Sequence, residues 1–461
     1  MYCKTTLENG IRVVTEMMPQ VRAIAISIVV DVGPKDEKPE QSGLAHLVEH
    51  LMFKGTSSRD AMQIARLMDV AGGMMGGFTS RDYTCYFATV LDDYRTYALD
   101  LFGDVILNSI FDEESLERER GVILREIEAD QDAPDQLAHN LLKANIWPNH
   151  PLGRLIAGQP EVVGKVTRED MIYFVHKHYV PDRLIIVAAG SVEHEDFVAQ
   201  VRDAFWRMLG QGSPVLSSPP ACHSGVIIRA RDLSQLYFAL GVKARSYTHP
   251  DRYGLHVLND LLGGGISSRL FHHLREERGL VYNVASSYHA YRDGGLLVIE
   301  GSTTPQGLMS VLSLTMAQLW RLAEEPVSEE ELWKARERIH SRHLIASEDT
   351  NTRMSRLATQ ELYFGYHIPA TEIVEQIQQV DQRTVQRLAQ ELMANGCPAL
   401  ALVGPQSHRH YSAEAVEKLL TETSAQVQRK PRSFSRTGKP VPEMSLTCQG
   451  EEHDALLYSQ P

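Results

Sequence analysis

An internal repeat places the strongest constraint on the fold of this chain. The acidic segment 111–116 recurs at 327–332, an offset of 216 residues, with Glu and Leu at matching positions. A repeat of this length corresponds to a whole domain and not to a short solenoid unit, and 461 residues are too many for one ordinary core. The chain is therefore predicted to contain two copies of one domain.

Each predicted copy mixes strands with helices. The first half reads as strands at 11–16, 23–32, 83–91 and 184–189, with helices at 44–53, 62–71, 94–107, 113–130 and 136–146. The second half reads as strands at 235–242, 282–291 and 295–302, with helices at 253–262 and 269–277. We therefore predict an α+β fold of two homologous α/β domains, each a mostly antiparallel sheet packed with helices.

Changes in composition suggest where these domains begin and end. Turn residues between 210 and 220 indicate a linker. From 424 onward, basic residues stand among Pro, Ser and Gly with few apolar side chains, which is typical of an extended segment. The predicted parts are an N-terminal domain, a linker, a C-terminal domain and a basic flexible tail, at 1–212, 213–224, 225–423 and 424–461. The tail is either an inert extension or a docking arm.

The first predicted copy contains a pentad that combines two imidazoles with a carboxylate. On a helix with about 100° per residue, His46 and His50 lie on one face with Glu49 beside them. Zinc hydrolases use two such His residues to hold the ion and an unligated carboxylate to accept a proton from water. Here the Glu precedes the second His, which is the inverted His-x-x-Glu-His arrangement. A chance occurrence on a helix surface is the alternative.

A second acidic segment supplies a candidate for the third ligand. Glu119 and Glu126 are seven residues apart, two turns of a helix, and therefore share a face. Glu126 is placed to complete a His-His-Glu site, and Glu119 to orient a ligand imidazole from outside it. Helices this rich in Glu and Arg are usually solvated, so the pairing with the pentad is what favours ligation.

Several further motifs carry a resemblance to a known family. They are Asn9-Gly10-Ile11-Arg12-Val13-Val14, Gly43-Leu44-Ala45-His46, Phe78-Thr79-Ser80, His150-Pro151-Leu152-Gly153 and Gly279-Leu280-Val281-Tyr282. With the pentad and its spacing to Glu126, they resemble the insulinase or pitrilysin family of inverted-motif zinc metallopeptidases, which includes mitochondrial processing peptidases and bacterial relatives. The resemblance runs over roughly residues 1–420. It implies that His46, His50 and Glu126 bind one Zn²⁺ per chain, with Glu49 as general base and Glu119 as supporting carboxylate.

The second half matches a further pair of that family. Members that cleave peptides carry an Arg and a Tyr seven residues apart to hold the substrate carbonyl, and Arg275 and Tyr282 have this spacing. Both are hydrogen-bond donors, which suits a developing oxyanion. Without the resemblance, they would be a surface Arg and a strand Tyr. The neighbouring His272 and His273 diverge by about 100° on a helix and are interpreted as structural.

One segment departs from the family's pattern. Where relatives usually carry Asn-Ala before an apolar residue and Thr, on the edge strand that pairs with substrate, this chain has Gly76, Gly77, Phe78 and Thr79. Gly76 at the Asn position removes one side-chain contact to the substrate, and glycine also makes the strand's entry flexible. Main-chain pairing needs no side chain. These four residues are therefore still expected to bind substrate.

Composition excludes other classes of function. A net charge of −13 argues against a nucleic-acid binder. The five cysteines are scattered without metal-type spacing, as expected of free thiols in a reducing compartment. No leader and no run of 18 apolar residues is visible. The expectation is a cytoplasmic protein without a membrane span.

Together these features predict a zinc metalloendopeptidase that hydrolyses short or unfolded polypeptides. The resemblance implies a chamber closed by two pairs of domains. A chain of 461 residues forms one half of this clamshell and pairs with itself or with a related chain. The alternative is a non-catalytic or weakly active partner subunit of a related peptidase. The sequence does not determine the substrate. It also does not determine whether the bound metal is zinc, manganese or cobalt.

Overall fold

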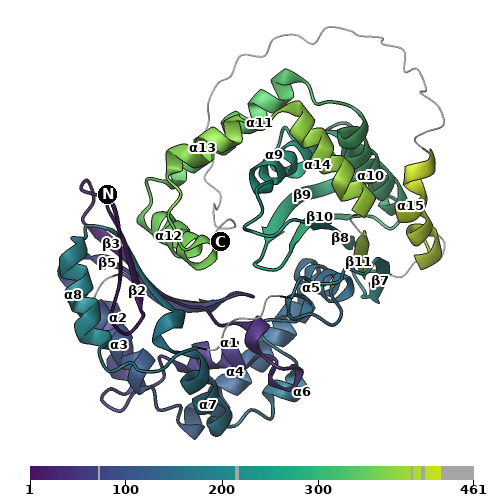
Figure 1. The fold of residues 1–461 in the computed structure, drawn as a ribbon. Coiled ribbons are helices and arrows are strands. Elements are labelled where there is room, and N and C mark those ends of the chain that lie inside the picture. Colours follow the sequence, from purple (N-terminus) through teal and green to yellow (C-terminus); the bar gives the residue numbers. More distant parts are fainter. Residues whose placement is uncertain (71–72, 213–217, 396–397, 406–410, 427–461) are drawn as a thin grey trace, which may run out of the picture.

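Two sheets, each backed by helices, make up the two lobes of the molecule (Figure 1). The computed structural model describes residues 1–70, 73–212, 218–395, 398–405 and 411–426. The N-terminal lobe holds β1 (Tyr2–Thr6), β2 (Arg12–Met17), β3 (Ala23–Val30), α1 (Leu44–Leu51), α2 (Ala61–Val70), β4 (Met74–Thr79), β5 (Thr84–Leu91), α3 (Arg95–Asn108), α4 (Glu113–Asp132), α5 (Pro134–Ile146), α6 (Pro160–Val163), α7 (Arg168–His178), β6 (Leu184–Gly190) and α8 (His194–Phe205).

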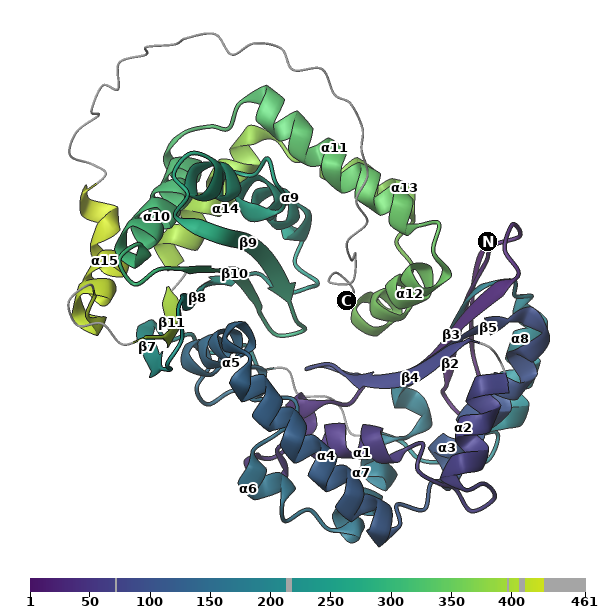
Figure 2. The ribbon, with the colours of Figure 1, turned by 180° about the vertical axis from the view of Figure 1, so that it is seen from behind.

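The C-terminal lobe repeats this mixture of elements. It holds β7 (Gly225–Ala230), β8 (Leu236–Ala244), α9 (Arg252–Gly263), a π-helix (Phe271–Glu276), β9 (Val281–Ala290), β10 (Gly295–Thr303), α10 (Leu308–Glu324), α11 (Glu329–Ala346), α12 (Thr350–Phe364), α13 (Ala370–Gln378), α14 (Gln382–Asn395), β11 (Ala399–Gly404) and α15 (Ala413–Gln426). Figure 2 shows α11 and α13 extending from this lobe toward the N-terminal one.

The two sheets have the same topology. The strand orders are β1-β2-β6-β3-β5-β4 and β7-β11-β8-β10-β9. Setting β1 aside, each order reads as one parallel pair, β2–β6 or β7–β11, followed by antiparallel pairs out to a hairpin edge. The predicted fold, two homologous domains with mostly antiparallel sheets, is confirmed.

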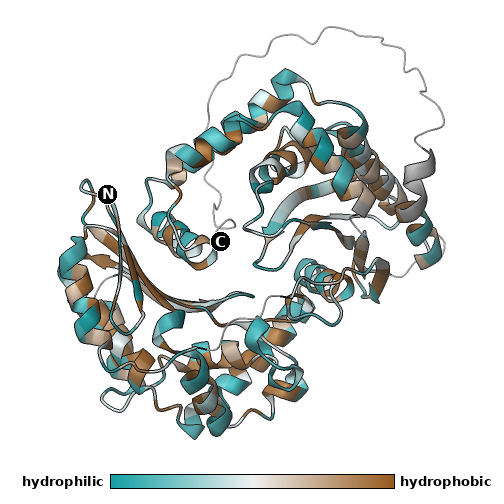
Figure 3. Ribbon diagram, in the orientation of Figure 1, coloured by the Kyte–Doolittle hydropathy of each residue, from teal (hydrophilic) through white to brown (hydrophobic). Residues whose placement is uncertain are grey.

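The central strand β3 explains why the first sheet is covered on both faces. All but its first residue are buried. Ile24, Ile26 and Ile28 join one core with α1 and α3, whereas the alternate residues Ala25 and Val29 join a second core on the opposite face. In Figure 3 the strands of this sheet are mostly brown, whereas the helices around it carry both teal and brown segments.

One face of each sheet is covered by a helix from the other half of the chain. α12 packs on β2, β3 and β6, while α5 packs on β7, β8 and β11. The two helices start at Pro134 and Thr350, which are 216 residues apart, so they are equivalent members of the repeat. Because of this reciprocal exchange, neither sheet is completed by its own half of the chain.

Several details differ from the sequence prediction or lie beyond it. The helix predicted at 269–277 is present, but residues Phe271–Glu276 of it form a π-helix. The helices after residue 303 and strand β11 were not predicted. Cys3 and Cys85 are free thiols, and the Cys222 sulfur accepts a hydrogen bond from the Trp147 ring. Cys397, Cys448, residues 213–217 of the predicted linker and residues 427–461 of the predicted tail lie outside the described residues.

Helix length and polarity bear on the membrane prediction. Among the helices that the structure describes, none is both long and apolar enough to cross a bilayer.

Candidate metal centre

Helix α1 carries the pentad into the core of the N-terminal lobe. Its leucines, Ala45 and Val48 are buried against the sheet, so the helix is fixed by packing along most of its surface. His46 and Glu49 are each only 8% exposed. The two polar side chains are therefore held in place by a surrounding apolar helix surface.

Helix α4 brings the downstream carboxylates to α1. It begins where Asp112 accepts a hydrogen bond from the Ser115 amide, a regular helix cap. Ile123 and Ile127 are buried in the same core as α1. The same helix brings Glu119 and Glu126 to His50 of α1, as their seven-residue spacing predicts.

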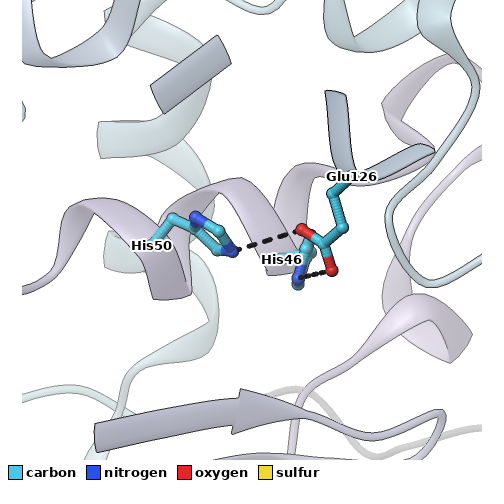
Figure 4. A group of neighbouring side chains, drawn as sticks. All are labelled: His46, His50 and Glu126. Carbon is cyan, nitrogen blue, oxygen red and sulfur yellow. Dashed lines mark ion pairs between the residues drawn. The ribbon is translucent and has the colours of Figure 1, made fainter. Parts of the chain in front are cut away.

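The two imidazoles and Glu126 converge on one point (Figure 4). His46 Nε2 lies 3.8 Å from one carboxylate oxygen of Glu126, and His50 Nε2 lies 3.7 Å from the other. One ligand atom from each residue lies within 4.8 Å of the others. Such separations are too long for hydrogen bonds. They approach the roughly 3.4 Å between ligand atoms around a tetrahedral ion with bonds of about 2.0–2.1 Å.

Glu119 orients His50 from the side away from this point. Its Oε2 lies 3.2 Å from His50 Nδ1, so the ring donates there and keeps Nε2 as a lone-pair ligand. Lys54 contacts the other oxygen of Glu119 at 2.9 Å. Burial alone would raise the pKa of Glu119, but the hydrogen bonds from Lys54 and His50 lower it. The carboxylate is thus kept ionised as an acceptor.

The residues fit a divalent metal. Burial, aided by the nearby His50 ring, lowers the pKa of His46 to about 3, so this imidazole is neutral as a metal ligand must be. His46 Nδ1 is buried and makes no hydrogen bond to any described residue. Among the described residues, this trio is the one group of three or more His, Cys, Asp or Glu side chains close enough to hold an ion.

Glu49 lies on α1 beside the trio. Burial is the main reason that its pKa is raised to about 7, with Glu126 adding to the rise and His50 opposing it. On the facing strand β4, a Cβ on residue 77 would lie 2.8 Å from Glu49 Oε1. Gly77 therefore leaves the space that the Glu49 carboxylate occupies.

The predicted substrate segment forms the edge strand β4. Its residues Met74–Thr79 pair with β5 on one side, and the sheet ends there. Phe78 packs against the rings of Tyr83 and Phe87, on the face away from Glu49. A Cβ on residue 76 would meet Phe87 at 3.4 Å, an ordinary contact, so packing does not demand Gly76.

Arg275 and Tyr282 are brought together, but on the C-terminal lobe. The Arg275 guanidinium lies between the rings of Phe271 and Tyr282, 4.7 and 5.3 Å from their centroids. Tyr282 is 76% exposed at the start of edge strand β9. In the part of the chain that the structure describes, neither residue makes a hydrogen bond, ion pair or ring contact with His46, His50 or Glu126.

The C-terminal copy has an ion pair between its helices instead of a metal trio. At the offset of 216, Arg342 on α11 takes the place of Glu126 on α4. Arg342 and Arg338 both contact Asp260 on α9, the latter at 2.6 Å. A cation supplied by the chain at this position excludes a metal ion by charge. Among the described residues, only the first copy has a trio of His, Cys, Asp or Glu side chains that could hold an ion.

Sequence reasoning missed two charged residues near the centre. Lys54, which holds Glu119, follows the pentad in the chain, but a lysine carries no signal of its own there. Glu37 precedes the pentad and accepts hydrogen bonds from the first residues of α1. The first contact joins residues far apart in the chain, and the second joins a side chain to backbone amides six and eight residues on, so periodicity reveals neither.

The fold and the site define a duplicated α/β protein with an inverted His-x-x-Glu-His metal trio in its first copy. Comparisons with known proteins agree. Residues 12–159 match the family "Insulinase (Peptidase family M16)", and residues 165–339 match "Peptidase M16 inactive domain". The chain belongs to the insulinase family of zinc proteases, peptidase family M16.

Similar proteins include two bacterial relatives and three solved structures. An "uncharacterized zinc protease", YmxG of Bacillus subtilis, is 36% identical over 400 residues, covering 87% of this chain and 97% of that protein. Another, ML0855 of Mycobacterium leprae, is 36% identical over 410 residues, covering 87% and 92%.

The structures are a protease from Helicobacter pylori (TM-score 0.82, 21% identity, 88% of this chain and 99% of that one) and a "peptidase M16 inactive domain" from Pseudomonas fluorescens (0.81, 20%, 88% and 98%). A chain of complex III2 from Candida albicans also matches (0.79, 16%, 91% and 99%). At these identities they establish the fold alone.

Proposed function

We propose that this chain is a zinc-dependent endopeptidase that hydrolyses short or unfolded polypeptides inside a chamber formed by two chains. The observation that carries the proposal is the convergence of His46, His50 and Glu126 on one point with Glu49 beside them. An ion held by these residues would polarise a carbonyl group and make water more acidic.

The chain's own residues account for the remaining steps. Glu49 accepts the proton of the attacking water and passes it to the nitrogen of the leaving amine. Glu119 holds His50 in the ligand tautomer, supported by Lys54. Both carboxylate oxygens of Glu119 and Nδ1 of His50 have partners. The orientation of the His50 ring is therefore set before substrate arrives.

Substrate would be held by main-chain pairing. β4 has a free edge next to Glu49, and residues Gly76, Gly77, Phe78 and Thr79 offer their peptide groups to an added strand. Only an extended segment can pair in this way, which favours short or unfolded chains. Arg275 and Tyr282 would donate to the carbonyl oxygen when the C-terminal lobe of either chain faces the centre.

Replacing the proposed base is the direct test. Glu49→Gln keeps the size of the side chain and leaves all three ligands in place, so bound Zn²⁺ should remain at one per chain. Cleavage of a quenched fluorescent peptide library should fall by at least the 10²–10⁴-fold typical of a lost general base. Zinc is measured by elemental analysis of the same samples.

The matched control is Glu128→Gln, the same exchange at an exposed position of α4. Its turnover should equal that of the unchanged protein. Undiminished cleavage by Glu49→Gln would refute the assigned base.

A second function is favoured by Gly76, which lacks the side chain that relatives use on substrate. In this alternative the chain is a non-catalytic or weakly active partner of a related peptidase. Stoichiometric zinc without hydrolysis of any library peptide, alone or beside a related chain, would support this alternative and contradict the proposed peptidase.

A further inference from the structure

The helix that carries the metal ligands has no cap of its own. α1 begins after Gly43, which has no side chain to accept a hydrogen bond and has a φ of 93°. The first amides of any helix need partners from outside the helix. In a helix of only eight residues, a first turn whose amides lack hydrogen-bond partners would weaken a large part of the helix.

Glu37 supplies these partners. One carboxylate oxygen accepts from the Gly43 amide at 3.0 Å and the other from the Ala45 amide at 2.8 Å. The residue is 5% exposed. A buried carboxylate that accepts from two amides at the start of a helix acts as its cap. The second amide belongs to the residue immediately before His46.

Close contacts with neighbouring segments hold both Glu37 and the start of α1 in place. The Arg154 guanidinium donates to the Glu37 carbonyl at 2.8 Å. At residue 43 a Cβ would lie 2.6 Å from the Ala157 carbonyl, and at residue 158 it would lie 2.4 Å from the Ser42 carbonyl. The first turn of α1 therefore rests on the backbone at 157–158 and is tied down by the Glu37 carboxylate.

We propose that Glu37 is a positioning residue for the metal centre. By binding the amides of Gly43 and Ala45, it sets where α1 begins and how the helix is rotated, so that His46 and His50 face Glu126. The inference deepens the proposed function, because it rests on a metal bound by that trio. Glu37 itself touches neither the metal ligands nor substrate in this role.

The test compares two conservative exchanges by titration with Co²⁺, whose visible spectrum reports its ligands. Glu37→Gln keeps the shape of the side chain but loses its charge and faces one amide with an NH₂ group. Its Kd for Co²⁺ should rise about 10–100-fold, as for other residues that orient metal ligands. Glu40→Gln, at an exposed position three residues on, should leave the Kd unchanged.

A purely structural role must be separated from positioning. Ile186→Val removes one methylene from the same core at a position on β6, outside the helices of the metal trio, and should lower the melting temperature while leaving the Co²⁺ spectrum and Kd unchanged. If Glu37→Gln also leaves both unchanged, the proposal is overturned. If Glu37→Gln does not fold, Glu37→Asp takes its place, since the shorter side chain reaches fewer amides and should raise the Kd in the same direction.

Failure of the metal site itself would be recognised separately. If the unchanged protein binds no Co²⁺, the proposed function fails. Hydrogen exchange of the Gly43 and Ala45 amides then decides about Glu37. Exchange that is faster in Glu37→Gln than in Ile186→Val supports the anchoring of α1, and equal exchange in the two variants contradicts it.

Discussion

At the scale of single residues, environment separates side chains of the same type. Glu49 and Glu119 are both near His50, yet burial raises the pKa of Glu49 to about 7, while the contacts with Lys54 and His50 lower that of Glu119. Two carboxylates driven in opposite directions are suited to different tasks. One is ready to take a proton, and the other remains an ionised acceptor.

The buried His178 on α7 should make stability depend on pH. Burial, helped by Arg183, lowers its pKa from 6.5 to about 4, with Asp36 opposing. The folded protein thus favours the neutral ring, and this contribution is complete above pH 6.5 and is lost as the pH falls from 6.5 toward 4. Between pH 7.5 and pH 5, the melting temperature should fall by about 2 °C more than in His178→Gln.

The control for this prediction is His176→Gln, an exposed position on the same helix. Melting curves at both pH values should show the unchanged protein and His176→Gln behaving alike. Equal pH dependence in His178→Gln would mean that the buried imidazole does not titrate as argued.

At the scale of elements, the exchange of α5 and α12 ties the lobes into one structure. Met354, Leu357 and Leu362 of α12 pack in the core on the face of the first sheet opposite α1 and α3. Ion pairs surround this contact, with Arg353 2.7 Å from Glu16 and Lys4 2.8 Å from Glu361. The lobes therefore share their cores, although the sequence suggested two domains joined by a linker.

A fragment of residues 1–212 should consequently fail to fold alone. Without α12 it exposes the apolar face formed by Val14, Ala25, Val29, Ile185 and Val187. We expect aggregation, seen by size-exclusion chromatography, and recovery of a 1:1 complex when residues 218–461 are co-expressed. A fragment that stays monomeric and melts at the temperature of the whole chain would contradict the shared cores.

At the scale of the whole molecule, both parts of the proposed machinery are open to solvent. The lobes curve about a common centre, with α12 between them (Figures 1 and 2). The side chain of Glu126 is 45% exposed, and Tyr282 is 76% exposed. Charge stabilisation by donors is strongest where water is excluded, so the proposed peptidase is expected to need a second chain that encloses them.

We therefore predict a dimer as the active species. Light scattering should give a mass twice that of the 51.7 kDa chain, or the sum with a related chain if the pair is mixed. Dilution below the dissociation constant should reduce specific activity. A strictly monomeric species with full peptidase activity would contradict the dimer.

The sequence alone determined those features that a local pattern encodes. The i and i+4 spacing of His46 and His50 puts both rings on one helix face, and the seven-residue spacing of Glu119 and Glu126 does the same on α4. The 216-residue repeat determined two similar sheets. These follow because the period of a helix and the length of a domain appear directly in the order of residues.

Tertiary structure alone decided how these parts meet. The approach of Glu126 to both imidazoles, the contacts of Lys54 and Glu37, and the exchange of α5 and α12 all join segments far apart in the chain or across a turn. Such contacts depend on which faces the cores bring together and how closely side chains approach. No period along the chain records them, because they depend on long-range packing and not on the local order of residues.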